Sequence, residues 1–308
     1  MTQPQPFVSI IIPVFNDAIG LKRCLAALEQ QTYPKHLYEV IVVDNGSQAE
    51  QDVAGVVALH KHAILAHENQ PGSYAARNRG IALAKGGVLA FTDADCIPAP
   101  DWVEQGVQTL VHNPDCGLVA GNIQISFQNQ DQPTAIELYE SLWYPLSQAE
   151  FIEKHHFGAT ANLFTFAHVM AKVGAFDSTL KSNGDREWGQ RVYAAGYRPL
   201  YAETVCVTHP ARHSLGQLYG RARRIMGGRY DLQQKSEPSF FKRNGIFAIT
   251  LIKYSLAPIP MLGFNLFLDR RLKTFKQRLQ ISLIMGFVSY VYVWEMLRLK
   301  WGGISYRG

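Results

Sequence analysis

The chain has 308 residues, of which 47% are hydrophobic, so it can bury a substantial core in one large or two small domains and is not a disordered chain. Its formal net charge of +5 is a mild excess concentrated in the last third, and we expect no nucleic-acid partner. Four widely spaced cysteines without a Cys-x-x-Cys pair argue against a disulfide scaffold or a structural zinc site, and they favour a reducing cytoplasm. The first residues lack the basic start and apolar run of a secretory signal, so the N-terminus is expected to stay in the cytoplasm.

Short apolar runs alternate with segments of helical period up to about residue 95, which is typical of βαβ units that build a parallel sheet. The predicted strands are nearly all apolar, as strands covered on both faces must be. They are Val8 to Phe15, Tyr38 to Asp44, Ala63 to His67 and Val88 to Thr92. The predicted helices between them are Ile19 to Gln31 and Ser73 to Ala84. Mixed strand and helix are expected from Gly117 to about Phe176.

Polar residues follow three of these strands. Ligands of such sheets bind beyond the carboxyl ends of the strands, so these residues are candidates for a binding site. They are Asn16, Asp17, Asp44, Asp93 and Asp95. Four acidic residues at one edge of a sheet are unusual, which makes this edge the place to look for chemistry.

The strongest signal is Asp93-Ala94-Asp95, directly after the buried strand VLAFT. Two carboxylates one residue apart at a strand end can hold a hard divalent cation through oxygen ligands. Such a cation would offset the negative charge that builds on a leaving diphosphate. An acidic turn after a strand is the alternative for an isolated Asp-x-Asp.

The surrounding motifs favour the metal site. PVFND, VVDNGS and PGSYAARNRG precede the triplet, and FGATANLF, VGAFD, GDREWGQRVYAAGYRP and then His209 follow it. In order and spacing they resemble the family-2 glycosyltransferases of the GT-A fold over about residues 7 to 210. The resemblance implies an α/β fold with a mainly parallel Rossmann-like sheet flanked by helices. It also implies inverting, metal-dependent sugar transfer from a nucleoside-diphosphate donor, favouring a UDP-sugar, to a hydroxyl acceptor.

The resemblance also suggests a division of the chain. A GT-A catalytic domain is expected over residues 1–212, with a nucleotide-sugar half at 7–95 and an acceptor half at 96–212. Residues 213–308 are expected to form a basic, apolar helical extension.

The resemblance places the donor site on the first half. Pro13 to Asp17 matches the turn whose backbone and aromatic ring line the nucleotide base, so Phe15 would stack on the base unless it packs in the core. Asp44 matches the acidic residue that accepts a hydrogen bond from uracil, and an Asx turn is its alternative. Arg77 matches a basic residue close to the base and phosphates, with a solvated helix-face arginine as its alternative.

The resemblance assigns the general base to Asp185. A carboxylate suits this work when it is held within hydrogen-bond reach of the acceptor, whereas helix N-capping would explain an Asp here without catalysis. Glu187 and Trp188 take the next acidic and apolar positions of the motif, on the acceptor side. Gly184 departs from the pattern, because the family's usual Glu is absent there.

His209 resembles the histidine that completes the metal or diphosphate site in many of these enzymes. Together with Asp93 and Asp95 it would suit Mn²⁺ or Mg²⁺, although a lone histidine is more often an ordinary surface or core residue. By the same resemblance, Gly158 to Asn162 matches the family's glycine-opened acceptor-side loop, where small residues let a bulky sugar approach the backbone.

Other functions are open at this point. Nucleotidyl transfer on a similar sheet also needs a metal, but it would not need Asp185. A dinucleotide-dependent dehydrogenase lacks the expected Gly-x-Gly-x-x-Gly after an early strand. A catalytically inactive, membrane-attached binding protein would not need to retain Asp93, Asp95 and Asp185 together.

The last third is expected to dock on the cytoplasmic face of a membrane without crossing it. Gly245 to Leu268 is long and apolar, but Lys253, Pro258 and Pro260 interrupt it. Ile281 to Trp294 is short of the about 20 residues that a spanning helix needs. The alternative is that both segments are buried helices of a soluble protein.

Charge supports docking. A hairpin that crossed the membrane would put the central basic cluster on the outer face, whereas in-plane or re-entrant helices keep every basic group beside anionic lipid. The flanking basic residues are Lys242, Arg243, Arg270, Arg271, Lys273, Lys276, Arg278, Arg298 and Lys300. We therefore expect attachment to the inner face of the cell membrane and a lipid-linked or polysaccharide-precursor acceptor. RARRIMGG departs from the Gln-x-x-Arg-Trp motif of processive synthases, which favours single-sugar transfer.

Overall fold

The computed structural model describes residues 5–143, 146–237, 239–256 and 271–306, and it divides into two compact units. The sheet unit combines Met1–Ser126, Leu146–Thr179 and Gly184–Pro210. The helical unit combines Phe127–Pro145, Leu180–Asn183 and Ala211–Gly308. The expected domain boundary at residue 212 stays a prediction, because compactness does not test whether either part folds alone.

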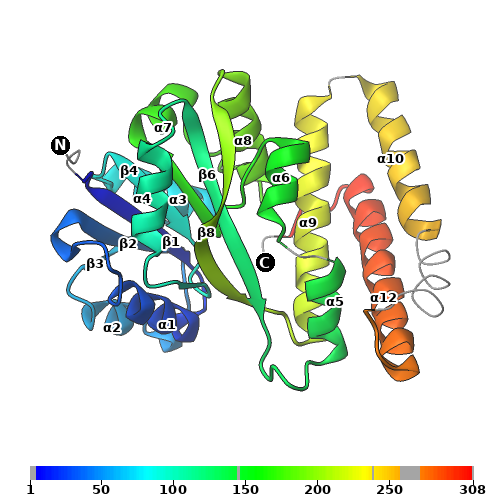
Figure 1. The fold of residues 1–308 in the computed structure, drawn as a ribbon. Helices are drawn as coiled ribbons and strands as arrows, with labels where there is room; N and C mark the ends of the chain where they lie inside the picture. The colour runs from blue at the N-terminus through cyan, green and yellow to red at the C-terminus, as the bar shows by residue number, and fades with distance from the viewer. Residues whose placement is uncertain (1–4, 144–145, 238, 257–270, 307–308) are drawn as a thin grey trace. The chain divides into compact units, whose positions relative to one another are not determined.

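One mixed sheet forms the centre of the sheet unit (Figure 1). Its strands are β1 (Val8–Val14), β2 (Tyr38–Asp44), β3 (Ala63–His67), β4 (Val88–Thr92), β5 (Ile97–Pro98), β6 (Cys116–Ser126), β7 (Asn162–Phe166) and β8 (Arg198–Pro210). They lie in the order β3-β2-β1-β4-β7-β6-β8-β5. The pairs β3-β2, β2-β1, β1-β4 and β6-β8 are parallel, and the other three are antiparallel. The α/β class with a mainly parallel sheet is therefore confirmed.

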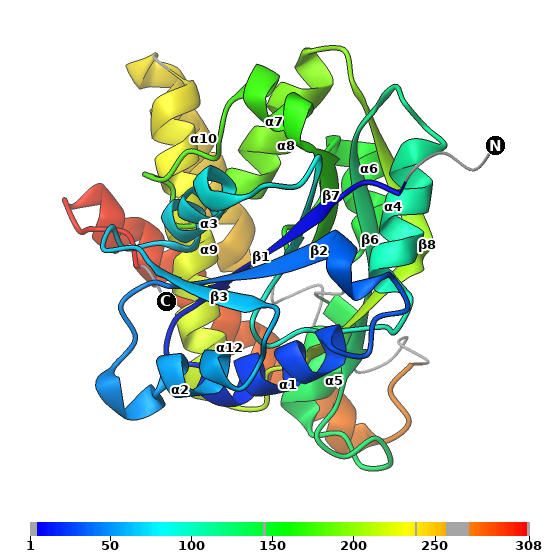
Figure 2. The same cartoon turned by 90° about the vertical axis from the view of Figure 1, so that its left-hand side faces the viewer.

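Helices cover both faces of the β3-β2-β1 part of this sheet. The helices of the unit are α1 (Ala18–Leu28), α2 (Val53–Ala58), α3 (Ser73–Leu83), α4 (Trp102–Val111), α6 (Gln148–His155), α7 (Ala167–Val173) and α8 (Gly184–Ala194). Helices α1 and α2 lie on one face and α3 on the other (Figure 2). Because side chains alternate across a strand, Ile10 and Ile12 pack with α1, whereas Ile41 and Val43 pack with Ala76 of α3.

The observed elements follow the predicted ones within a few residues, and local chemistry explains their ends. Helix α1 begins after Asp17, whose carboxylate accepts a hydrogen bond from the Gly20 amide at 2.9 Å. Helix α3 approaches β1 closely at Gly80, where a Cβ would lie 2.5 Å from a methyl carbon of Ile11. The predicted strand Val8 to Phe15 ends one residue earlier, so Phe15 belongs to the turn.

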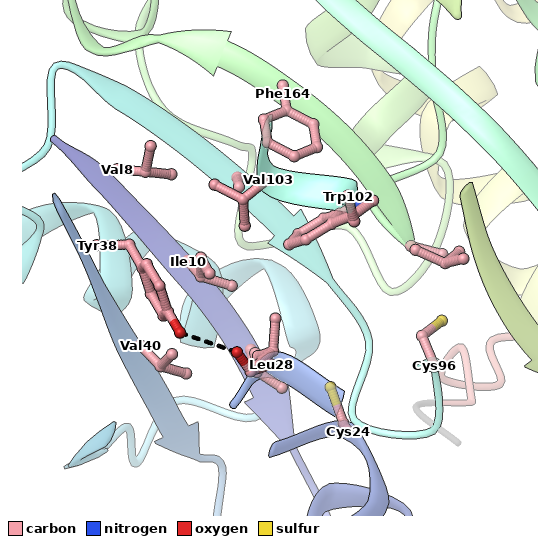
Figure 3. Close-up of a cluster of buried hydrophobic side chains, with 14 of the residues drawn as sticks. Val8, Ile10, Cys24, Leu28, Tyr38, Val40, Cys96, Trp102, Val103 and Phe164 are labelled. Carbon is pink, nitrogen blue, oxygen red and sulfur yellow. Dashed lines mark hydrogen bonds between the residues drawn. The ribbon is translucent and has the colours of Figure 1, made fainter. Parts of the chain in front are cut away.

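The main apolar cluster lies against β1, β2 and β4 (Figure 3). Trp102 of α4 packs on Phe164 of β7 with ring centroids 4.7 Å apart, and the Tyr38 hydroxyl donates to the carbonyl of Leu28 at 2.9 Å. These contacts hold β1, β2 and β4 in place. A site built on the ends of these strands would therefore have a rigid support, which a precise site requires.

Four helices form the described part of the helical unit. They are α5 (Ala135–Trp143), α9 (Leu215–Ser236), α10 (Phe240–Leu256) and α12 (Phe275–Lys300). Helix α12 packs against the other three, and both α9 and α12 begin with a capping box. Their shared apolar cluster includes Leu218, Met226, Ile281 and Val288.

Buried glutamates tie this unit together. Glu140 of α5 is 5% exposed and accepts hydrogen bonds from Arg212 at 2.8 Å and Arg221 at 2.9 Å. Glu295 of α12 is fully buried and accepts one from Arg223 of α9 at 3.0 Å. A buried charge without a partner destabilises the folded state, so these ion pairs hold the helices of the unit together.

The structure corrects one argument about the membrane. The segment Ile281 to Trp294 is part of a helix of 26 residues, which is about 39 Å long and sufficient to cross a membrane. The argument that it is too short is therefore wrong. Of the first segment, Gly245 to Leu256 lies in α10, whereas Pro258 and Pro260 lie outside the described residues. Arg270, in the basic cluster after this segment, lies outside them as well.

Candidate active site

The carboxyl ends of β1, β2 and β4 meet at one edge of the sheet, as predicted. Parallel register puts Val14 beside Asp44, and β1 itself lies between β2 and β4. The turn Phe15 to Asp17 follows β1, and the Asp93 to Asp95 turn follows β4. The predicted donor residues therefore extend from neighbouring strands.

The turn after β1 presents an aromatic ring. Phe15 is 40% exposed, so the alternative that it packs in the core is wrong. Pro13 lies past the last β1–β4 pair, which joins Ile11 to Phe91, so its missing N–H does not interrupt that ladder. Asp17 is engaged as the cap of α1.

The two oxygens of the Asp44 carboxylate have different neighbours. Its Oδ1 accepts a hydrogen bond from the Ser47 amide at 2.9 Å, so the side chain is engaged in the turn, although the bond reaches three residues on and not the two of an Asx turn. Its Oδ2 lies 3.7 Å from Nδ1 of His67 on β3. The turn therefore orients the carboxylate without using its second oxygen, and recognition of a base by that oxygen stays a prediction.

Arg77 and Asp93 form a buried ion pair. Nη2 of Arg77 donates to Oδ1 of Asp93 at 2.5 Å, and the arginine side chain is only 4% exposed. The alternative of a solvated helix-face arginine is therefore wrong. Its Nε is buried and has no hydrogen-bond partner among the described residues, which is costly unless a ligand supplies an acceptor.

Asp95 and His209 come together from distant parts of the chain. Strand β5 starts just after Asp95 and pairs with the end of β8, where Ile97 lies opposite Thr208. This antiparallel pairing brings Oδ2 of Asp95 to 3.6 Å from Nε2 of His209. The imidazole is mostly buried, and its Nδ1 lies 2.8 Å from the carbonyl oxygen of Pro210, which orients the ring.

The chemistry of this donor set fits a divalent cation. Asp95, Cys96 and His209 place one ligand atom each within 4.8 Å of one another. Burial raises the pKa of the Cys96 thiol well above its ordinary value, so the sulfur stays protonated and is a poor ligand for Mn²⁺ or Mg²⁺. The carboxylate of Asp95 is a suitable ligand for such a cation, and the imidazole of His209 would add a nitrogen ligand beside it.

The structure does not bring every predicted ligand into this group. Asp93 turns to Arg77 instead, and Ala94 between the two acids is buried in the apolar cluster. Cys96 belongs to the group although sequence reasoning passed over it. Its position directly after Asp-x-Asp was the available signal.

Asp185 lies in the first turn of α8, and a tyrosine contacts it. Oδ1 of Asp185 accepts hydrogen bonds from the Tyr74 hydroxyl at 3.2 Å and from the Arg186 amide at 2.9 Å. Burial raises the pKa of Asp185 above its ordinary value. A carboxylate with a raised pKa is a stronger proton acceptor once ionised, which suits a general base. Sequence reasoning missed Tyr74, although it stands within PGSYAARNRG.

The predicted acceptor residues of the Gly158 to Asn162 loop have structural partners. Asn162 is fully buried, accepts from Nε1 of Trp102 at 2.8 Å and donates to the carbonyls of Asn122 and Val205. A Cβ at Gly158 would lie 2.7 Å from the Cβ of Ala120. The structure thus corrects the expectation of an acceptor contact at Asn162, because its polar atoms are already used inside the protein.

The same holds for the predicted acceptor residues of α8. Trp188 is fully buried and its indole N–H donates to the carbonyl of Gly174 at 3.0 Å. Glu187 pairs with Arg191 one turn later, at 2.6 Å between Oε1 and Nε. These contacts anchor the helix that carries Asp185, and they engage the polar atoms of both side chains inside the protein.

Comparison with known proteins adds a family to this geometry. The family model described as glycosyl transferase family 2 matches residues 9–174. Glycosyltransferase AglE of Haloferax volcanii is 40% identical over 254 residues, which cover 82% of this chain and 81% of that protein. The pre-mycofactocin glycosyltransferase of Mycobacterium tuberculosis is 32% identical over 217 residues, which cover 68% of this chain and 43% of that protein.

A solved structure supports the fold. Mannosyltransferase PcManGT from Pyrobaculum calidifontis, in complex with GDP-Man and Mn²⁺, matches with a TM-score of 0.63 at 18% identity, covering 95% of this chain and 88% of that one. At this identity the likeness bears on the GT-A-like fold. The family match decides against nucleotidyl transfer, a dehydrogenase and an inactive binding protein. This chain belongs to glycosyl transferase family 2 and is a nucleotide-sugar glycosyltransferase.

Proposed function

We propose that the enzyme is an inverting, divalent-cation-dependent transferase that moves one sugar from a UDP-sugar to a hydroxyl acceptor. The observation that carries this proposal is the pairing of Asp95 with His209, 3.6 Å apart, in the same unit as a base candidate whose pKa is raised. A donor diphosphate needs a cation, which the Asp95–His209 pair could hold, and an acceptor hydroxyl needs a base to take its proton.

The residues suggest a single displacement. Asp185 takes the proton of the acceptor hydroxyl, whose oxygen forms a bond to the anomeric carbon while the bond from that carbon to the diphosphate oxygen breaks. The electron pair of the broken bond leaves with the diphosphate. A cation held by Asp95 and His209 would supply positive charge to that leaving group. One displacement gives one inversion, so the product anomer is opposite to that of the donor.

Two further residues support a nucleotide at this edge. The buried Nε of Arg77 lacks a partner among the described residues, and a phosphate oxygen would satisfy it. Phe15 offers an exposed ring for stacking on the base, while Asp44 supplies an acceptor for a ring N–H, which uracil carries at N3 and guanine at N1. The resemblance favours uridine, and the donor GDP-Man bound to the structural neighbour is the natural competitor.

We also propose that the helical unit docks on an anionic membrane surface and that the acceptor is lipid-linked. One side of α12 is buried, whereas the other exposes Phe275, Leu279, Leu283, Tyr290 and Trp294 at helical spacing. Helix α10 likewise exposes Ile246, Ile249, Ile252 and Leu256. Both helices also carry basic residues in their last turns, and exposed apolar faces on basic helices are typical of proteins that lie in a membrane interface.

A donor panel tests the proposed chemistry. Hydrolysis of UDP-, GDP-, dTDP- and ADP-sugars is measured with Mn²⁺, with Mg²⁺ and with excess EDTA. Turnover of a UDP-sugar that EDTA stops supports the proposal, whereas full activity in EDTA or preference for GDP-mannose would overturn the cation or the uridine assignment. Proton NMR of the product checks inversion.

A further inference from the structure

The hydroxyl of Tyr74 reaches the proposed base across 111 residues of sequence, donating to Oδ1 of Asp185 at 3.2 Å. Tyr74 stands in the first turn of α3 and is 5% exposed. The tyrosine side of this contact is therefore shielded from water. The amide of Arg186 donates to the same oxygen at 2.9 Å, so Oδ1 is held from two sides.

The ring of Tyr74 is fixed by its neighbours. The ring of Phe176 packs on it with centroids 5.7 Å apart, and the guanidinium of Arg77 lies 5.6 Å from its centroid. Arg77 follows three residues later on the same helix and pairs with Asp93. The first two turns of α3 therefore contact both Asp185, the proposed catalytic base, and Asp93, which directly follows β4.

Gly184 makes room for this ring. A Cβ at Gly184 would lie 2.6 Å from Cε2 of Tyr74 and 2.8 Å from two more ring carbons, all closer than real side chains approach. Gly184 directly precedes Asp185 in α8. Any larger residue would have to push the ring, and with it the hydroxyl, away from the carboxylate. The family's usual Glu at this position would clash with the Tyr74 ring, which gives a physical reason for the glycine here.

We propose that Tyr74 is the positioning residue of Asp185, and that glycine at 184 is required because the tyrosine ring occupies the space of its side chain. The inference rests on the proposed role of Asp185 as base. With Oδ1 fixed by Tyr74 and by the Arg186 amide, Oδ2 is the oxygen that receives the acceptor proton. Fixing one oxygen keeps the other within reach of the hydroxyl, which general-base catalysis requires.

The first test is Tyr74→Phe, which keeps the ring over Gly184 and removes only the hydroxyl. We expect kcat to fall about tenfold with the KM for the donor unchanged within about twofold. The acid limb of the kcat profile should move to higher pH, because the lost bond stabilised the ionised carboxylate. The other groups that act on this carboxylate, Arg77, Asp93 and the Arg186 amide, stay in place.

The second test is Gly184→Ala, alone and combined with Tyr74→Phe. Alone it should lower kcat by a similar factor, because the displaced ring withdraws the hydroxyl. In the double variant the two losses should not multiply, because both remove the same contact. Tyr193→Phe, at a half-exposed position on α8, is the matched control and should behave like the wild type.

The outcomes separate this inference from the proposed function. If Asp185→Asn is inactive while Tyr74→Phe keeps the wild-type kcat and pH profile, the inference is wrong and the base assignment stands. If Asp185→Asn stays active, both the base assignment and the inference about Tyr74 are wrong. A Tyr74→Phe variant that loses thermal stability and activity at every pH, with no shift of the acid limb, would show a merely structural role and overturn the inference as well.

Discussion

The carboxylate of Asp95 and the imidazole of His209 lie 3.6 Å apart, although 113 residues separate them in the chain. Antiparallel pairing of β5 with β8 fixes this distance, because Ile97 and Thr208, two residues after the acid and one before the histidine, are register partners. The distance between Asp95 and His209 is therefore fixed by the sheet and not by a flexible loop, as a site of defined geometry requires.

This arrangement predicts that Asp95→Ala loses Mn²⁺ and donor affinity together. Removal of the carboxylate takes away a ligand and with it the bridge to the diphosphate. Isothermal titration of the variant with Mn²⁺, and then with nucleotide in the presence of Mn²⁺, measures both. Asp115→Ala removes an acid that is 65% exposed, and it should bind like the wild type. Donor binding that survives in Asp95→Ala would mean that the cation is held elsewhere.

Asp185→Asn is expected to cut turnover about 100-fold or more while leaving donor affinity nearly unchanged. The substitution keeps the size of the side chain and removes its ability to take a proton. Single-turnover kinetics, together with nucleotide titration, separate the two effects. Glu187→Gln is the matched control, because Glu187 is paired with Arg191 on the same helix. An active Asp185→Asn with an inactive Glu187→Gln would move the base to Glu187.

The raised pKa of Asp185 predicts a second effect of Asp185→Asn, on stability. Burial raises the pKa in the folded state above that of the unfolded chain, so the folded state binds the proton more tightly. The folded wild type therefore loses stability as the pH rises above the ordinary pKa of an aspartate. This loss is still present at neutral pH. The variant should unfold at a higher temperature than the wild type at pH 8, with the difference shrinking toward pH 4. Scanning calorimetry in EDTA measures this, and an equal difference at all pH values would contradict it.

Sequence patterns predicted the sheet well for a physical reason. Strands buried on both faces must be apolar, and the polar residues that end them must then share one edge, so Asp44, Asp93 and Asp95 were predictable. The pairing of Arg77 with Asp93 was not, because it depends on how far α3 lies from β4. The burial of Asn162 and the length of α12 were likewise not predicted, because both depend on packing between segments that are distant in the sequence.

In the helical unit, Glu140→Ala should lower the free energy of unfolding by about 3–5 kcal/mol, the usual effect of removing one partner of a buried ion pair. Arg212 and Arg221 would lose their shared carboxylate in a mostly buried place. Urea unfolding followed by circular dichroism provides the measurement. Glu150→Ala breaks an exposed pair with Lys154 and should cost less than about 1 kcal/mol. Equal effects of the two substitutions would show that the buried cluster contributes nothing beyond a surface pair.

The last prediction concerns the apolar face of the helical unit. If α12 lies in a membrane interface, Leu283→Glu should reduce binding to vesicles that contain anionic lipid by at least about tenfold, because a charge then replaces an apolar contact. Leu59→Glu, at an equally exposed leucine of the sheet unit, is the control and should bind like the wild type. Binding should weaken with salt, because each basic side chain near the surface contributes about 1 kcal/mol through anionic lipid.

Docking and crossing give different results in the same vesicles. A docked α12 leaves both of its ends on the side where the protein was added, so protease added to that side should cut near Arg271 and near Trp301. A crossing helix would protect one end. The buried Glu295, bound to Arg223 of α9 and to Arg298, favours docking, because these contacts keep one whole side of α12 on the protein. Protection of either end would show that the helix crosses, and vesicle binding by Leu283→Glu at the wild-type level would show that this face is not what holds the enzyme on lipid.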